Sequence, residues 1–184
     1  MKKRQRGAGL FSALALLLLI GAAVLLWLPP QPVTPPPAPG PSALQGPVDH
    51  ILIFKAERRM VVFRDGNPLK TYTIALGFTP KGDKLRQGDG RTPEGRFRIN
   101  RRNAASAYHL SLGLDYPQAE DITRARAGGY NPGGDIFIHG QPNSRKGQAT
   151  LRQDWTAGCI AVADAEIEEL WAATPNGTSV EIRP

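Results

Sequence analysis

Cys159 is the only cysteine of this chain, and its surroundings are the strongest sign of chemistry in the sequence. It follows Gly158, which allows a tight backbone turn, and it precedes an apolar run that begins at Ile160. A single cysteine excludes an intramolecular disulfide and a multi-cysteine zinc site. A buried cysteine that acts only as a small apolar side chain is one interpretation. A tight turn also gathers backbone N–H groups around the thiol, as acyl transfer to a cysteine nucleophile requires.

A nucleophilic cysteine needs a neighbouring base, because a free thiol is mostly protonated near pH 7. Two of the three histidines lie at the start of the predicted domain and in a polar stretch. The third, His139, ends the apolar segment 135–139 and is followed by Gly140. A lone histidine at a strand end is more often structural. Its combination with a second rigid placement, Gly158-Cys159, favours His139 as the base for Cys159.

The elements that must position these residues are mostly strands. Short apolar or alternating segments predict strands at 51–54, 60–63, 71–76, 96–99, 110–114, 135–139 and 179–182. Helices are expected at 119–127 and at 164–171, the second with Asp164 as its N-cap. Segment 77–90 is a polar loop that contains glycines. The pattern predicts a mainly β, α+β single domain with antiparallel pairing and one or two short helices.

The first 47 residues predict a membrane anchor followed by a spacer. Residues 1–6 carry four positive charges and form the expected cytoplasmic tail, and residues 7–28 are uncharged and long enough to span a bilayer as a helix. We favour an uncleaved anchor over a cleaved signal peptide, because no small-x-small cleavage site ends the run. Residues 29–47 hold nine prolines and should form an extended spacer. The catalytic domain is expected at 48–184.

Charge places that domain outside the cytoplasm and argues against nucleic acid as a partner. The positive residues precede the apolar run, so the positive-inside rule puts the domain on the outer, periplasmic or extracytoplasmic, side of the cytoplasmic membrane. The domain would be secreted if the N-terminal segment were cleaved. The net charge of +7 comes largely from the first six residues. The other basic residues are scattered, with no basic stripe interleaved with aromatic side chains.

The motifs around His139 and Cys159 resemble the L,D-transpeptidase catalytic domain, also called the YkuD domain. That family has His-Gly, about sixteen residues, and then Ser/Thr-His-Gly-Cys with an apolar residue. Here sixteen residues separate His139 from Thr156-Ala157-Gly158-Cys159-Ile160, and 91–97 matches the Thr-Pro-x-Gly-x-aromatic stretch of the family. The resemblance covers residues 49–183. It implies a YkuD-like mixed β-sandwich.

Two departures from the family pattern concern the substrate. Ala157 stands where the family often has histidine, and Ala161 stands where it often has arginine. The segment 154–161, Asp-Trp-Thr-Ala-Gly-Cys-Ile-Ala, looks like the subgroup typified by YafK. Members of that subgroup are associated with hydrolysing a peptidoglycan linkage. The two departures leave transferase and hydrolase activity both open.

The resemblance implies a peptidoglycan-modifying cysteine acyltransferase with a role in cell-wall biogenesis and cell shape. Its nucleophile would attack a diamino-acid carbonyl of the stem peptide and form a thioester. The alternatives are an L,D-carboxypeptidase or amidase acting on peptidoglycan or on its cross-link to a lipoprotein, and a non-catalytic cell-wall binding module. The expected partners are peptidoglycan stem peptides, a cell-wall-linked lipoprotein and the cytoplasmic membrane. No cofactor and no metal are implied.

The resemblance also assigns roles to individual residues. His139 accepts the Cys159 proton, either during attack or already in the free enzyme as a thiolate–imidazolium pair. The carbonyl of Gly140 orients the imidazole ring. The N–H groups around Ala157, Gly158 and Cys159 stabilise the oxyanion. Thr156 and Trp155 shape the pocket wall.

Overall fold

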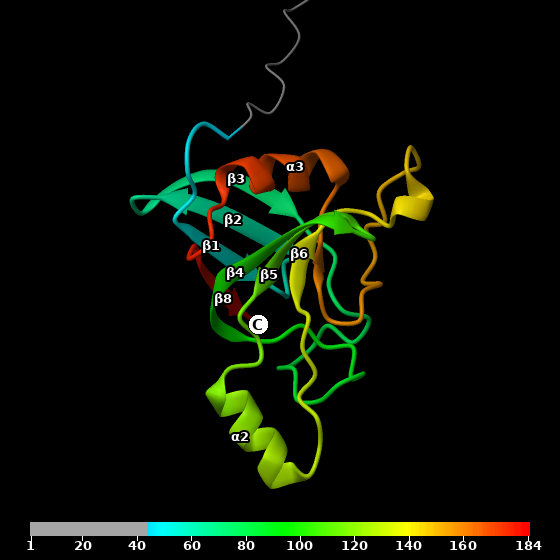
Figure 1. Ribbon diagram of the computed structural model, residues 1–184. Helices are drawn as coiled ribbons and strands as arrows, with labels where there is room; N and C mark the ends of the chain where they lie inside the picture. The colour runs from blue at the N-terminus through cyan, green and yellow to red at the C-terminus, as the bar shows by residue number, and fades with distance from the viewer. Residues whose placement is uncertain (1–43) are drawn as a thin grey trace, which may run out of the picture. The chain divides into compact units, whose positions relative to one another are not determined.

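The computed structural model describes residues 44–184 (Figure 1). The predicted cytoplasmic tail, the predicted anchor and residues 29–43 of the predicted spacer lie outside the described residues. Within 44–184, no helix combines the length and the apolar character that a membrane crossing needs. The elements that position Cys159 and His139 all belong to this described part.

Eight strands pair in one continuous order, β3-β2-β1-β8-β4-β5-β6-β7. Their bounds are β1 (His50–Phe54), β2 (Arg59–Arg64), β3 (Asn67–Thr73), β4 (Gly95–Ser106), β5 (His109–Leu114), β6 (Phe137–His139), β7 (Ile160–Ala161) and β8 (Ser179–Arg183). The β1–β8 and β6–β7 pairs are parallel and the other pairs are antiparallel. The fold is therefore a mixed β-sheet, in agreement with the predicted mainly β class.

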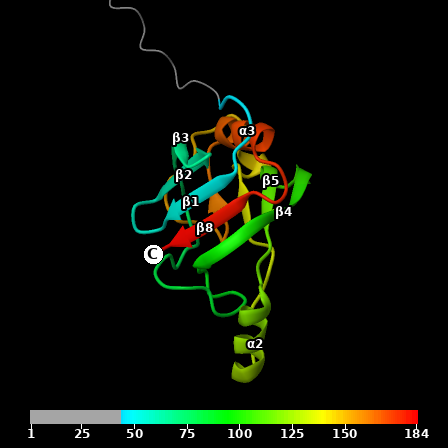
Figure 2. The same cartoon turned by 90° about the vertical axis from the view of Figure 1, so that its left-hand side faces the viewer.

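The long strand β4 joins the two halves of this sheet. Its first residues, Gly95 to Arg98, pair with β8, and its later residues, from Ile99 to Ser106, pair with β5. Figures 1 and 2 show β4 passing from one half to the other. The family resemblance implied a mixed β-sandwich, and the strands form two groups that share β4 within one pairing order. The strand pattern alone did not reveal this link, because it predicted β4 only over 96–99.

Among residues 44–184, the helices are α2 (Ala119–Gly128), α3 (Asp164–Ala173) and one turn of 3₁₀ helix, η1 (Asn143–Arg145). Figures 1 and 2 show α3 against the sheet and α2 projecting from the opposite end. Ile167 and Leu170 of α3 are fully buried in the core. The predicted N-cap is wrong by one residue, since Ala163 is the N-cap. The Asp164 carboxylate instead accepts the N–H of Gln141 at 2.8 Å.

The polar loop predicted at 77–90 is irregular in the structure and is fixed at several points. The buried ammonium of Lys55 donates to the carbonyls of Gly82 and Thr92 at 2.7 and 2.8 Å and pairs with Glu94 at 2.8 Å. At the start of this loop, Gly77 forms an isolated β-bridge with Thr156. These contacts hold the loop and the chain just before Cys159 together.

Candidate active site

The parallel pairing of β6 with β7 brings His139 and Cys159 together. His139 is in register with Ala161, two residues beyond Cys159. Register partners share a face of a sheet, and so do residues two apart along a strand. His139 and Cys159 therefore belong to one face, while Ile138 and Ile160 are buried completely in the core on the other. The contact between the two side chains that the sequence spacing predicted stays a prediction.

The imidazole of His139 is buried and oriented by its own neighbour. Its Nδ1 lies 2.7 Å from the carbonyl oxygen of Gly140. Because a carbonyl oxygen only accepts, Nδ1 must carry the proton, and Nε2 is left with a lone pair. The rings of Tyr108 and Trp155 lie 4.6 and 5.7 Å from the His139 ring, between centroids. His139 is thus held as a neutral base with Nε2 as its basic atom.

The thiol of Cys159 borders a cavity of about 320 Å³. Its Sγ donates to the carbonyl of Asp135 at 3.4 Å and makes no hydrogen bond with His139 among residues 44–184. Asp135 adopts a left-handed conformation with φ 54°, which aspartate tolerates better than most residues. Catalytic hydrogen bonds are often long or absent before substrate binds.

The turn that carries Cys159 is braced by Thr156. The Thr156 hydroxyl accepts the N–H of Gly158 at 3.1 Å and donates to the carbonyl of Cys159 at 2.7 Å. Thr156 is buried, so it supports the turn from behind. The Gly158 amide is already engaged, whereas the N–H groups of Ala157 and Cys159 form no hydrogen bond within 44–184. Those two amides are the ones available to an oxyanion.

The two departures from the family pattern have different surroundings. Ala157 is exposed and lines the cavity beside Cys159, so the absent imidazole leaves open space there. Ala161 is buried in the sheet and exchanges backbone hydrogen bonds with Ala75 at 2.8 Å. A side chain at position 161 would therefore lie within the packed sheet.

Burial shifts the pKa values of both predicted catalytic groups toward their neutral forms. It raises the pKa of the Cys159 thiol, an effect that the backbone at Phe137 and the charges of Lys84 and Arg101 offset in part. It lowers the pKa of His139, which the Gly140 carbonyl offsets in part. The free protein should therefore hold a thiol beside a neutral imidazole, and not a thiolate–imidazolium pair.

This charge state predicts how Cys159 reacts with iodoacetamide as pH changes. The rate should stay low at neutral pH and rise steeply above about pH 8.5, the ordinary thiol value, because the raised pKa delays thiolate formation. The measurement is the alkylation rate from pH 5 to 10, followed by intact-protein mass spectrometry. A rate that is already at its plateau between pH 5 and 8 would instead identify a pre-formed ion pair.

Sequence reasoning missed Lys84, which is buried and lines the Cys159 cavity. It belongs to the polar loop that precedes β4, where a lysine normally indicates solvent exposure. No pattern in the sequence distinguishes it from exposed Lys81, three residues earlier. Within residues 44–184, no group of three or more His, Cys, Asp or Glu side chains is placed to hold a metal ion.

A family model describing the L,D-transpeptidase catalytic domain, YkuD, matches residues 48–182. This chain belongs to that family. YafK of Escherichia coli (strain K12), named as a candidate L,D-transpeptidase, is 30% identical over 134 residues, which are 70% of this chain and 48% of YafK. The L,D-transpeptidase-family chain thus spans about half the length of the curated relatives it matches.

Solved structures of similar fold support the same assignment. Pgp2 of Campylobacter jejuni, a helical cell shape determining protein, has a TM-score of 0.57 and 25% identity, over 79% of this chain and 52% of Pgp2. An L,D-transpeptidase from Xylanimonas cellulosilytica has a TM-score of 0.52 and 16% identity, over 90% of this chain and 69% of that structure. The second likeness concerns the fold alone.

Proposed function

We propose that this chain is a cysteine acyltransferase that acts on peptidoglycan stem peptides, with Cys159 as nucleophile and His139 as base. The observation that carries the proposal is the orientation of His139. Its Nδ1 is occupied by the Gly140 carbonyl at 2.7 Å, which leaves a basic Nε2 on the strand beside Cys159. Membership of the L,D-transpeptidase family supports stem peptides as the substrate.

The reaction begins with transfer of the Cys159 proton to Nε2 of His139. Sγ then attacks a diamino-acid carbonyl. The oxyanion that forms accepts hydrogen bonds from the free N–H groups of Ala157 and Cys159. Each such donor is worth about 3–4 kcal/mol of transition-state stabilisation. The imidazolium returns its proton to the leaving amine as the C–N bond breaks. A thioester between the stem peptide and Sγ remains.

The fate of the thioester decides between transferase and hydrolase. An amine of a second stem would displace Sγ and form a cross-link, whereas water would release a shortened stem or a detached lipoprotein. Hydrolysis is the second candidate because of Ala157. This residue is exposed, lines the cavity with Cys159, and leaves room for water where the family often has histidine.

The proposed location is the outer side of the cytoplasmic membrane, with residues 7–28 as a single-pass anchor and the proline-rich segment 29–47 as a spacer. The absence of charge from 7–28 and the four positive charges before it support this proposal. A spacer suits a substrate that stands away from the membrane. Similarity to Pgp2, a helical cell shape determining protein, supports a role in cell shape.

The test is incubation of the protein with purified muropeptides, followed by mass spectrometry of the products. A cross-linked dimer joined through two diamino acids is expected for the transferase. A shortened or released stem identifies the hydrolase, through the same thioester. If neither product nor a thioester adduct on Cys159 forms with any muropeptide, the chain is a binding module and the enzymatic proposal is wrong.

A further inference from the structure

One side of the Cys159 cavity is formed by the loop that contains Lys84, and this side is charged. The same cavity is lined by Lys84, Gln87, Gly133, Asp135, Ala157 and Cys159. The Lys84 side chain is only 3% exposed, which is rare for lysine and costly unless the ammonium is paired. Surface lysines keep a protein soluble, but a buried ammonium that shares a cavity with a candidate nucleophile must have another role.

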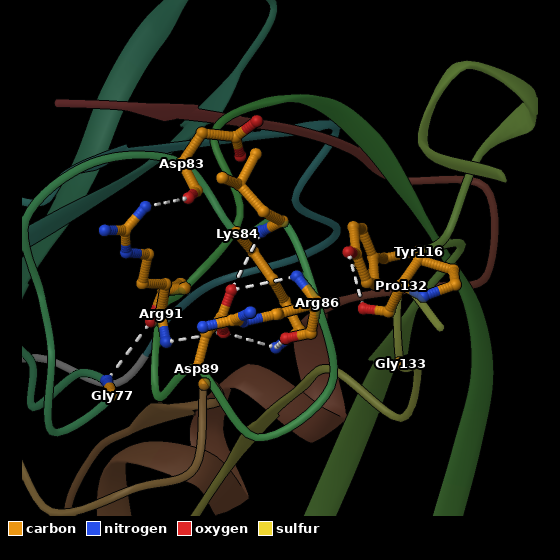
Figure 3. Close-up of polar contacts among 12 residues, drawn as sticks. Gly77, Asp83, Lys84, Arg86, Asp89, Arg91, Tyr116, Pro132 and Gly133 are labelled. Atoms are coloured by element: carbon orange, nitrogen blue, oxygen red, sulfur yellow. Dashed lines mark hydrogen bonds and ion pairs between the residues drawn. The ribbon is translucent and has the colours of Figure 1, made fainter. Parts of the chain in front are cut away.

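Asp89 holds this ammonium in place. Its carboxylate accepts the Lys84 ammonium at 2.8 Å and the backbone N–H groups of Leu85, Arg86 and Arg91 at 2.8 to 3.1 Å (Figure 3). Burial alone would raise the pKa of Asp89, but these donors lower it to about 2. Asp89 therefore stays ionised and holds the Lys84 side chain in place through their ion pair.

The donors of Lys84 are not all used within the protein. Its Nζ has three N–H groups and donates to Asp89 and to the Arg86 carbonyl, the latter at 3.2 Å. No third acceptor lies within hydrogen-bond distance in the part of the chain that is described. One N–H of a buried ammonium is thus left for a ligand that enters the cavity.

The charge around the cavity also favours an anion. Asp135, the carboxylate on the opposite wall, is paired with Arg101 at 3.0 Å. Arg86 and Arg91, which flank Asp89 in the loop, form no ion pair within residues 44–184. Lys84 is the cationic side chain of this loop that lines the Cys159 cavity, whereas Arg86 and Arg91 line a neighbouring pocket. An ammonium and a carboxylate make one of the stronger hydrogen bonds available to a protein.

We propose that Lys84 is a specificity-determining residue that binds a carboxylate of the acyl donor in the cavity it shares with Cys159. This inference rests on the proposed function. A stem peptide offers two such carboxylates near the scissile carbonyl, that of the diamino-acid side chain and that of the C-terminal residue. Binding either one would place the carbonyl against Sγ, while Asp89 keeps the ammonium from moving with its ligand.

The test compares three synthetic stem peptides on the full chain. One carries both carboxylates, and in each of the others one carboxylate is converted to a carboxamide. Wild-type protein should have a kcat/KM about 10- to 100-fold lower for the carboxamide that removes the Lys84 ligand, and this arm identifies which carboxylate binds. Lys84→Met, which keeps the length of the side chain, should lower kcat/KM for the unmodified peptide by a similar factor. It should leave the rate on that carboxamide unchanged.

Lys81→Met is the matched control, because Lys81 lies in the same loop but is exposed and lines no part of the Cys159 cavity. It should behave as wild type on all three peptides. An equal loss on every peptide in Lys84→Met would assign Lys84 a purely structural role, and no loss would remove it from binding. Either result overturns the inference, and so does a wild-type protein that is indifferent to both carboxamides.

Calorimetric binding to Cys159→Ala separates this inference from the proposed function. Without turnover, that variant should bind the unmodified peptide about 10- to 100-fold more tightly than the critical carboxamide, and adding Lys84→Met should abolish the difference. A binding difference without any turnover by wild type would refute the enzyme and retain the carboxylate site. Turnover by wild type without a binding difference would retain the enzyme and refute the carboxylate site.

Discussion

Replacing Cys159 by alanine is expected to lower acyl transfer from stem peptides by at least about 10³-fold. The reason is that no other cysteine exists to form the thioester. The thiol makes one weak contact, to the Asp135 carbonyl at 3.4 Å, so its loss should change the free energy of unfolding by less than about 1 kcal/mol. Product formation by mass spectrometry and thermal unfolding on the same sample measure both quantities.

Cys159→Ser is the control that separates packing from nucleophilicity. Serine has nearly the size of cysteine and keeps a hydrogen-bond donor to Asp135, but its hydroxyl ionises far less readily than a thiol. It should therefore fold as wild type does and be nearly as inactive as the alanine variant. If Cys159→Ala kept its activity, the cysteine would be the small apolar core residue that its type alone allows.

The sequence alone singles out His139 and Cys159 as the candidate pair because their signal is local. A histidine at the end of an apolar strand, a glycine before a lone cysteine and sixteen residues between the motifs together specify two rigid placements. The β6–β7 register places His139 opposite Ala161, on the strand that follows Cys159. Most strands were predictable for a similar reason, since alternation and apolar runs depend on neighbouring residues.

What the sequence did not predict depends on contacts between distant segments. β7 is only two residues long, and β4 runs well past its apolar alternation because β5 and β8 pair with different parts of it. The burial of Lys84 could not be predicted from the sequence, because the residues that line the cavity with it, 133–136 and 157, lie far along the chain. The N–H of Gly158 was expected to face the oxyanion, but it donates to the side-chain hydroxyl of Thr156, a contact that the sequence pattern does not reveal.

Gly158→Ala should both destabilise the domain and disable the active site. Gly158 has φ +136°, a conformation that residues with a Cβ rarely adopt, and an added Cβ would lie 2.7 Å from the carbonyl oxygen of Arg91. That carbonyl cannot retreat easily, since the Arg91 N–H is bound to Asp89 at 3.1 Å. Strain and overlap together should cost about 2–4 kcal/mol of unfolding free energy. Tm should fall by about 8–16 °C.

Gly95→Ala isolates the part of this effect that comes from backbone strain. Gly95 has a similar φ of +129°, but an added Cβ would meet only ordinary contacts, the nearest at 3.7 Å on Phe97. It should cost about 1–2 kcal/mol and leave the activity of the folded protein unchanged. The additional loss in Gly158→Ala then measures the Arg91 contact, and its lost activity reflects a displaced Cys159. Equal Tm changes in the two variants would show that the turn yields to a side chain, so the nucleophile would not depend on a rigid Gly158.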